Sequence, residues 1–264
     1  DSSTSRGLGD VYKRQVIGKN AFVQVFESTR GMRVGDEAEF EGHMLEVTLG
    51  PGMLSRNYDG LQNDLDKMEG VFLRRGEYTF PLDNDKLWDF KPLAKVGDKV
   101  TAGGWLGEVD ENFQPHKIMV PFTFKGEYTV KSLKEAGQYT IGEVIAVLTD
   151  ETGKDVEVTM IQRWPVKRAI TCYKEKPRPY KLLETGVRTI DTVNPIVEGG
   201  TGFIPGPFGT GKTVLQHAIS KQAEADIVII AACGERANEV VEIFTEFPEL
   251  IDPHTGRKLM ERTI

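Results

Sequence analysis

Apolar positions repeat with different spacings along the chain, and these spacings separate a β-rich front from an α/β end. Short runs rich in aromatic and β-branched residues, such as 21–26 and 43–49, alternate with glycines. Short strands separated by glycine turns predict part of a small β-barrel over 16–50. Pro and Gly positions over 51–82 then indicate a looped connector, with one brief helix expected at 61–68.

A second β-rich section covers 83–165. It combines runs of β-forming residues with Gly, Asp and Asn positions that are typical of turns. After it, the Pro-rich stretch 176–179 predicts an extended connection. The strands expected in this section are 96–100, 102–109, 118–124, 127–130, 144–148 and 156–161.

The final section, 166–264, changes to an alternation of strands and helices. A short strand is expected at 201–205, before a glycine-rich loop, and apolar positions over 213–225 recur with helical spacing. The continuous apolar run 226–232 is typical of a buried parallel strand, and 238–247 predicts a second helix. This order of strand, loop, helix, strand and helix predicts a parallel α/β domain.

The first 15 residues differ from all of these sections. They are polar, rich in Ser, Gly, Arg and Lys, and show no periodic apolar pattern. We interpret them as a non-native remnant of cloning or sequence assembly, or alternatively as a short flexible native tail, and leave them out of the predicted fold.

Composition narrows the class of protein. The chain has 264 residues, 39% of them hydrophobic and 28% charged, which is an ordinary globular balance. Its net charge of -7 argues against nucleic acid as a partner of the whole surface, although a local basic patch stays possible. No apolar run is long enough for a membrane span or a secretory signal. Cys172 and Cys233 lie far apart without metal-ligand spacing, so we expect reduced thiols in a cytosolic protein.

Residues 206–213 fit the pattern G-x-x-x-x-G-K-[ST], between a predicted strand and a predicted helix. Glycines let the backbone curl so that several N–H groups point at a phosphate, and the helix N-terminus adds partial positive charge. Lys212 is then expected to reach the β- and γ-phosphates, and the Thr213 hydroxyl to ligate Mg²⁺. A glycine-rich turn with a chance lysine is the alternative. The predicted ligand is Mg-ATP or Mg-GTP, bound by Gly206, Pro207, Phe208, Gly209, Thr210, Gly211, Lys212 and Thr213.

This loop and several other stretches resemble the catalytic A subunits of V-type and A-type rotary ATPases. The resemblance extends over 16–264, and the long insertion ahead of the loop distinguishes this subunit type from its noncatalytic partner and from F-type relatives. It implies an α/β plus β fold, with a partial N-terminal β-barrel, a β-rich bulge over 83–165 and the N-terminal half of a RecA-like P-loop domain over 166–264. The matching stretches are 49–52, 185–191, 206–213, 233–239, 246–250 and 260–263.

The resemblance also implies roles for three residues of the second signature. Glu235 is implied to orient and polarise the attacking water, which hydrolysis requires near the γ-phosphate. Arg236 is implied to link the nucleotide site to the subunit interface, and Glu239 to support the site as a further carboxylate. The alternatives are a pair of acidic residues that complement a helix dipole for Glu235 and Glu239, and a surface ion pair for Arg236.

Two residues of the loop carry smaller expectations. Phe208 packs against the loop or simply fills space. The eukaryotic vacuolar enzymes carry Cys where Thr210 stands, so thiol regulation does not transfer to this chain. Thr210 favours a bacterial or archaeal type of complex, on the cytoplasmic face of the plasma membrane.

Several parts of the family pattern are missing from the sequence. No later apolar strand ends in an Asp that could bind Mg²⁺ through water, and Asp226 begins its strand rather than ending it. In the family this Asp, the adenine pocket and a C-terminal helical domain follow the point that corresponds to Ile264, and the front of the barrel also precedes the match. The expectation is therefore a truncated chain that binds phosphate weakly and hardly turns over ATP alone.

The middle section has a second resemblance. Residues 96–109 also resemble a biotinyl or lipoyl carrier domain, which presents a lysine at a hairpin tip. Here 111–114 holds no lysine, and Lys117 comes too late. A structural bulge that meets peripheral stalk parts is the preferred interpretation.

The predicted function is catalysis in a rotary ion-translocating ATPase or ATP synthase that uses Mg²⁺ with ATP or ADP. The implied partners are noncatalytic B subunits that alternate with this subunit in a ring of six and supply an arginine finger, the central and peripheral stalk subunits, and indirectly the membrane sector that moves H⁺ or Na⁺. The alternatives are a related hexameric motor such as a secretion ATPase, and an inactive chain that acts as an assembly module.

Overall fold

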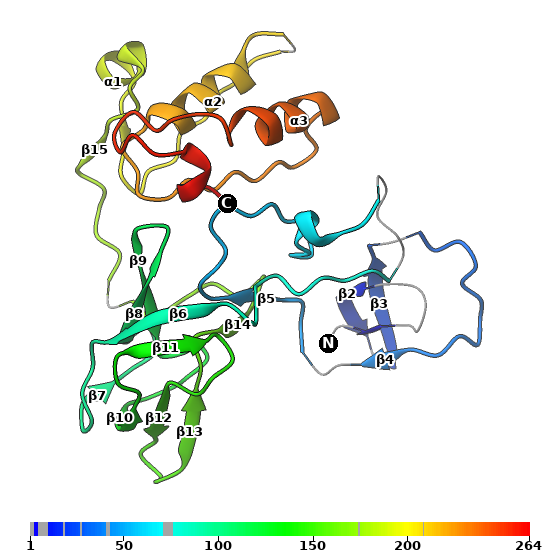
Figure 1. The fold of residues 1–264 in the computed structure, drawn as a ribbon. Helices are drawn as coiled ribbons and strands as arrows, with labels where there is room; N and C mark the ends of the chain where they lie inside the picture. The colour runs from blue at the N-terminus through cyan, green and yellow to red at the C-terminus, as the bar shows by residue number, and fades with distance from the viewer. Residues whose placement is uncertain are drawn as a thin grey trace. The chain divides into compact units, whose positions relative to one another are not determined.

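The computed structural model describes residues 3–4, 10–17, 19–26, 28–40, 43–70, 76–173, 175–207 and 209–264. The chain divides into two compact units (Figure 1). Unit 1 contains Asp1–Glu111 and Pro115–Cys172, and unit 2 contains Asn112–Gln114 and Tyr173–Ile264. None of the helices in the described ranges has the length and apolar character that crossing a membrane requires.

An open antiparallel sheet begins unit 1. Its strand order is β3-β2-β1-β4, so β3 and β4 are its edges and the sheet does not close. The first 15 residues, which were left out of the predicted fold, contribute β1 and most of β2. The strands are β1 (Ser3–Thr4), β2 (Asp10–Ile17), β3 (Asn20–Val25) and β4 (Glu39–Phe40).

The expected barrel strand at 43–49 belongs to a different sheet. β5 (Glu46–Leu49) pairs antiparallel with β14 (Gln162–Pro165), more than 100 residues later in the chain. The Gln62 side chain covers the other edge of β5: its amide accepts from the Thr48 N–H and donates to the Thr48 carbonyl, both at 2.7 Å. The backbone of Thr48 thus has a hydrogen-bonding partner beside β5, and β14 pairs with the other edge of the strand. β5 and β14 therefore connect the two ends of the section between them (the inserted section), and β5 does not extend a barrel.

Two four-stranded sheets form most of the inserted section. Their strand orders are β13-β12-β10-β7 and β11-β6-β8-β9. The predicted strands are recovered in whole or in part, while β6 and β11 were not predicted. The strands are β6 (Leu87–Pro92), β7 (Lys99–Val100), β8 (Trp105–Glu111), β9 (Gln114–Met119), β10 (Tyr128–Leu133), β11 (Gly137–Thr140), β12 (Ala146–Thr149) and β13 (Asp155–Val158).

These sheets enclose two buried apolar clusters. Phe90 packs against the backbone of Gly107, where an added Cβ would lie 2.2 Å from the Phe90 ring. Only glycine fits there, because such a contact lies far inside van der Waals distance. The first cluster is Leu82, Trp88, Phe90, Val109, Ile118, Ile141, Ile145 and Met160, and the second is Leu106, Val120, Val130, Ala146, Leu148 and Val158.

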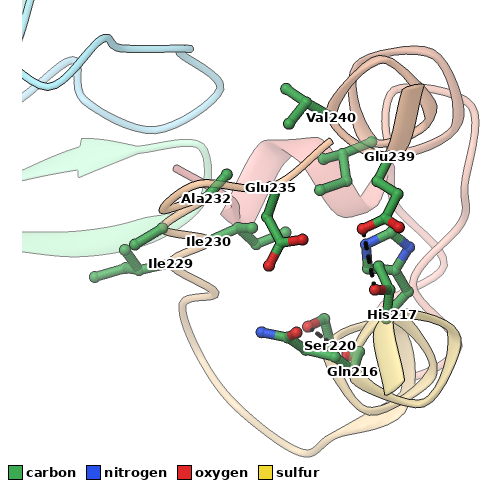
Figure 2. A pocket seen from close by; sticks show the side chains of 12 residues that line it. Gln216, His217, Ser220, Ile229, Ile230, Ala232, Glu235, Glu239 and Val240 are labelled. Carbon is green, nitrogen blue, oxygen red and sulfur yellow. Dashed lines mark hydrogen bonds between the residues drawn. The ribbon is translucent and has the colours of Figure 1, made fainter. Parts of the chain in front are cut away.

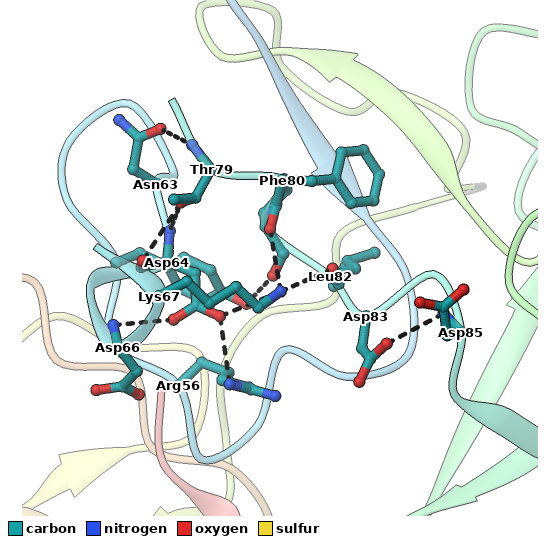
Figure 3. Close-up of polar contacts among 12 residues, drawn as sticks. Arg56, Asn63, Asp64, Asp66, Lys67, Thr79, Phe80, Leu82, Asp83 and Asp85 are labelled. Atoms are coloured by element: carbon teal, nitrogen blue, oxygen red, sulfur yellow. Dashed lines mark hydrogen bonds and ion pairs between the residues drawn. The ribbon is translucent and has the colours of Figure 1, made fainter. Parts of the chain in front are cut away.

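A polar network organises the connector that precedes the sheets (Figure 3). Its centre is the buried carboxylate of Asp64, which accepts from the Arg56 guanidinium at 3.3 Å and lies 3.6 Å from the Lys67 ammonium. The Asp64 N–H donates to the Thr79 hydroxyl at 2.7 Å. The helix expected at 61–68 is observed only as a short 3₁₀ turn, η1 (Leu65–Lys67). Asp64 caps this turn, and its side chain accepts a hydrogen bond from the Asp66 N–H.

Unit 2 carries the helices. The expected helices at 213–225 and 238–247 are confirmed as α2 (Lys212–Gln222) and α3 (Ala237–Glu246), which are linked by the Lys221–Glu246 ion pair (Figure 1). The remaining elements of the unit are β15 (Leu182–Leu183), α1 (Arg188–Val193), β16 (Ile196–Val197) and η2 (Leu259–Arg262).

Two predicted strands of unit 2 differ from the structure. Residues 201–205 form no strand. The run 226–232 is extended but not buried: it pairs only through a parallel bridge between Val228 and Thr263, and Ile229 is 72% exposed. A parallel strand becomes buried when it has neighbours on both edges and helices on both faces. Within the described ranges, 262–264 alone pair with this run, so its parallel direction is confirmed and its burial is not.

Candidate functional site

A tight glycine loop leads into α2. Gly209 and Gly211 have φ angles of 77° and 79°, in the left-handed region, and Gly211 is the N-cap of the helix. A Cβ added to Gly206 would lie 2.6 Å from the Thr210 hydroxyl oxygen, which itself donates to the Pro207 carbonyl at 2.8 Å. Glycine is therefore required at three points of this loop. Phe208 lies outside the described residues.

Lys212 opens α2 and is exposed. Within the described ranges its ammonium has no hydrogen-bond or ion-pair partner. The helix has 11 residues and no acidic residue of its own in the first turn, so its sequence adds no negative charge at its N-terminus. A lone ammonium beside free helix N–H groups suits a phosphate group.

Thr213 joins the loop to α3. Its hydroxyl donates to the Glu239 carboxylate at 3.2 Å. A hydroxyl that donates to a carboxylate keeps its oxygen lone pairs available for another partner, such as a cation. Glu239 is thereby connected to the glycine loop as well as lying in the first turn of α3.

A pocket lies between α2, α3 and the extended run before α3 (Figure 2). The Glu235 carboxylate points into this pocket from the end of the extended run. The lining residues are Thr213, Gln216, His217, Ser220, Ile229, Ile230, Ala231, Ala232, Glu235, Glu239, Val240 and Ile243.

The structure brings some of the predicted site residues together in one pocket and leaves others outside it. Thr213, Glu235 and Glu239 line one pocket, whereas Lys212 and Arg236 are exposed and do not line it. Arg236 is the N-cap residue of α3. Among the described residues, no group of three or more His, Cys, Asp or Glu side chains is arranged to hold a metal ion.

Sequence reasoning did not single out His217. It is the buried residue of α2 and packs edge-on against the Phe247 ring at 6.0 Å between centroids. Gln216, His217 and Ser220 follow Thr213 at positions i+3, i+4 and i+7, which lie on one helix face. That spacing could have placed all of them beside Thr213 once α2 was predicted.

Two family models match the chain on either side of the connection at 168–185. The ATP synthase alpha/beta subunit barrel-sandwich domain matches residues 79–167, and the nucleotide-binding domain of the ATP synthase alpha/beta family matches residues 186–264. The chain belongs to the ATP synthase alpha/beta family. The barrel-sandwich match covers both buried clusters, so the middle section is this family's domain rather than a carrier domain.

Similar proteins agree with this family assignment. The V-type ATP synthase alpha chain of Treponema denticola is 54% identical over 253 residues, and V-type ATP synthase alpha chain 1 of Treponema pallidum is 51% identical over 253 residues. The V-type ATP synthase alpha chain of Protochlamydia amoebophila is 49% identical, again over 253 residues. These matches cover 95% of the chain and 42–43% of each relative, so the chain spans less than half the length of these curated relatives.

Proposed function

We propose that these residues belong to the catalytic alpha subunit of a V-type or A-type rotary ATP synthase or ATPase, which binds Mg-ATP and couples its synthesis or hydrolysis to H⁺ or Na⁺ transport. One observation carries the proposal: the glycine loop at the N-terminus of α2 is joined to α3 by the Thr213–Glu239 hydrogen bond. The finer fold assignment is a RecA-like P-loop domain, supported by α2, α3 and the parallel pairing of 228–230 with 262–264.

Different groups of the loop bind the phosphates and Mg²⁺. Backbone N–H groups of the loop 206–213 and the Lys212 ammonium bind the β- and γ-phosphates, because they present positive charge at the N-terminus of α2. The Thr213 hydroxyl would offer its oxygen to Mg²⁺ while it donates its hydrogen bond to Glu239. When bound, Mg²⁺ would neutralise charge that develops on the phosphate oxygens.

The residues of the second signature act on the other side of the pocket. Glu235 holds and polarises the attacking water, because its exposed carboxylate points into the same pocket as Thr213. Arg236, exposed at the start of α3, links this site to the neighbouring subunit.

The assembly is part of the same proposal. The name shared by the similar proteins, V-type ATP synthase alpha chain, supports a ring in which noncatalytic B subunits alternate with this subunit and contribute an arginine finger. Central and peripheral stalk subunits connect the ring to the membrane sector, at the cytoplasmic face of the plasma membrane. A secretion motor has less support, because residues 79–167 match the barrel-sandwich domain of the ATP synthase family.

Replacing Lys212 tests this function. In a full-length subunit assembled with its partner subunits, Lys212→Ala should lower Mg-ATP hydrolysis by at least about 100-fold, because a preorganised charge on the transferring phosphoryl group is lost. Lys221→Ala is the matched control: it lies on the same helix, pairs with Glu246 at the surface and should retain turnover. Turnover unchanged by Lys212→Ala would refute the proposed function.

A further inference from the structure

A hairpin in unit 2 follows α3 and closes on itself through backbone hydrogen bonds. The Asp252 N–H donates to the Arg257 carbonyl at 2.7 Å, and the Leu259 N–H donates to the Leu250 carbonyl at 2.8 Å. The hairpin leads into η2 and then into residues 262–264, which pair with 228–230. One hairpin side chain forms an ion pair with a side chain of η2, and the proposed chemistry does not use this pair.

Asp252 and Arg262 form this buried ion pair. Asp252 is 1% exposed and Arg262 is 6% exposed. The Arg262 Nη2 donates to Asp252 Oδ1 at 3.2 Å, and Nε lies 3.2 Å from Oδ2 without forming a hydrogen bond. A planar guanidinium presents its N–H groups to several acceptors at fixed angles, whereas a lysine ammonium does not.

The carboxylate is held in its charged form. Burial alone would raise the pKa of Asp252, but the Thr255 hydroxyl, the His254 N–H and the Arg262 charge together hold that pKa below its ordinary value. The Thr255 hydroxyl donates at 2.7 Å and the His254 N–H at 3.1 Å. Contacts within the hairpin thus hold the Asp252 carboxylate in place, and the carboxylate in turn holds the Arg262 guanidinium.

Arg262 makes hydrogen bonds at the start of the extended run 226–232, which ends shortly before Glu235. Its guanidinium donates to the Ala225 carbonyl, and its own carbonyl accepts from the Val228 N–H at 2.9 Å. One residue therefore holds this run through both its side chain and its main chain. On the other side of the hairpin, His254 Nε2 makes a hydrogen bond of 2.9 Å with the Gln222 carbonyl at the end of α2.

We propose that Asp252 and Arg262 are positioning residues. They set the separation between α2, which carries Lys212 and Thr213, and the extended run 226–232, which leads to Glu235. This proposal rests on the proposed function. The hairpin contacts both elements, and the ion pair is its rigid connection. Arg262 touches no proposed reacting group, so it acts through the placement of Glu235.

The first test replaces Arg262 by Lys in the full-length subunit assembled with its partners. Lysine keeps the charge but cannot donate from one rigid plane to both Asp252 Oδ1 and the Ala225 carbonyl, as Arg262 does. We expect kcat to fall about 10-fold or more while the KM for ATP changes less than about 2-fold, because a small displacement of Glu235 affects the reaction more than binding. Arg257→Lys, the same change at an exposed position of the hairpin whose guanidinium lies over the Phe113 ring and not on Asp252, is the control and should leave both constants unchanged.

A second comparison separates positioning from a loss of structure. In a Glu235→Gln background, Arg262→Lys should cause no further fall in the residual rate, because its effect passes through Glu235. A further fall by the original factor would overturn the proposal. If Arg262→Lys does not assemble, Asp252→Asn keeps the shape of the carboxylate and should also lower kcat without raising KM.

The two proposals fail in different ways. Wild-type kcat and KM in both Arg262→Lys and Asp252→Asn, with Lys212→Ala inactive, would overturn only the positioning role. Turnover retained by Lys212→Ala would overturn the proposed function itself.

Discussion

The two units of the molecule hold their parts together by different means. In the barrel-sandwich region, side chains such as Leu106, Val120 and Leu148 are completely buried between the sheets. In unit 2, α3 has no buried residue, the one buried residue of α2 is His217, and Ile229 is mostly exposed. The first region is stabilised by apolar packing, which scales with the area removed from water.

The second region relies on backbone geometry and polar contacts. Left-handed Gly211, the Thr213–Glu239 hydrogen bond and the Asp252–Arg262 ion pair connect its elements. In this unit the conformation of the glycine loop is set by local backbone geometry and by these polar contacts. The difference between the units means that volume changes should affect unit 1 more than unit 2, and that backbone changes at the glycine loop should affect unit 2 more than unit 1.

The largest effect is expected from Phe90→Ala. Phe90 is 1% exposed and packs on Gly107 and edge-on against Tyr139, so its loss should lower the free energy of unfolding of unit 1 by about 3–5 kcal/mol. All three tryptophans of the chain lie in unit 1, so urea unfolding followed by tryptophan fluorescence reports on this unit.

The control for this prediction lies at an exposed position of unit 1, which the same fluorescence reports. Val96 is 65% exposed, and Val96→Ala should leave the fluorescence midpoint within experimental error. Equal shifts for both variants would show that burial of Phe90 is not the cause of its effect.

A smaller effect is expected from Glu111→Gln at the end of β8. The buried Glu111 carboxylate accepts from the Gly52 and Leu54 N–H groups at 2.7 and 3.0 Å and lies 2.6 Å from His116 Nδ1. The amide loses the charge that these groups stabilise, and we expect a loss of about 1–3 kcal/mol at pH 7. Glu108→Gln, on the same strand but with a partly exposed carboxylate paired with Lys117, should give a smaller loss.

This loss should depend on pH. Burial raises the pKa of Glu111, but the hydrogen bonds from His116, Leu54 and Gly52 outweigh it and lower the pKa below its ordinary value. A depressed folded pKa contributes stability above the unfolded pKa of about 4.3, and this stability is lost as the pH falls through the folded value. The difference between wild type and Glu111→Gln should shrink between pH 7 and pH 3, and a constant difference would contradict the ionised contact.

The sequence predicted what is encoded locally. Residues 206–213 and the two helices after them were predicted because the loop pattern and the helical spacing each lie within a few turns of chain. β6 was missed although Trp88 and Phe90 alternate with exposed positions, because Asp89, Lys91 and Pro92 interrupt the β-forming residues.

Features that join distant segments could not be predicted in this way. The pairing of β5 with β14 needs the whole inserted section to fold first, and the Thr213–Glu239 hydrogen bond needs α2 and α3 to pack. The run 226–232 is typical of a buried strand by composition, but burial depends on neighbouring strands rather than on the run itself.

The smallest effect, and the sharpest contrast between the units, is expected from Gly211→Ala. An added Cβ at Gly211 meets no atom within 4 Å, so the cost comes only from its φ of 79° and should be about 1–2 kcal/mol. Hydrogen exchange of peptides from α2 should accelerate about 5- to 30-fold, while the fluorescence midpoint of unit 1 stays unchanged. Gly142→Ala also meets no atom but has no left-handed φ, so it should change neither readout. Acceleration by both variants would mean that the backbone at the phosphate loop is not specially constrained, and a shifted midpoint with Gly211→Ala would mean that the two units do not unfold independently.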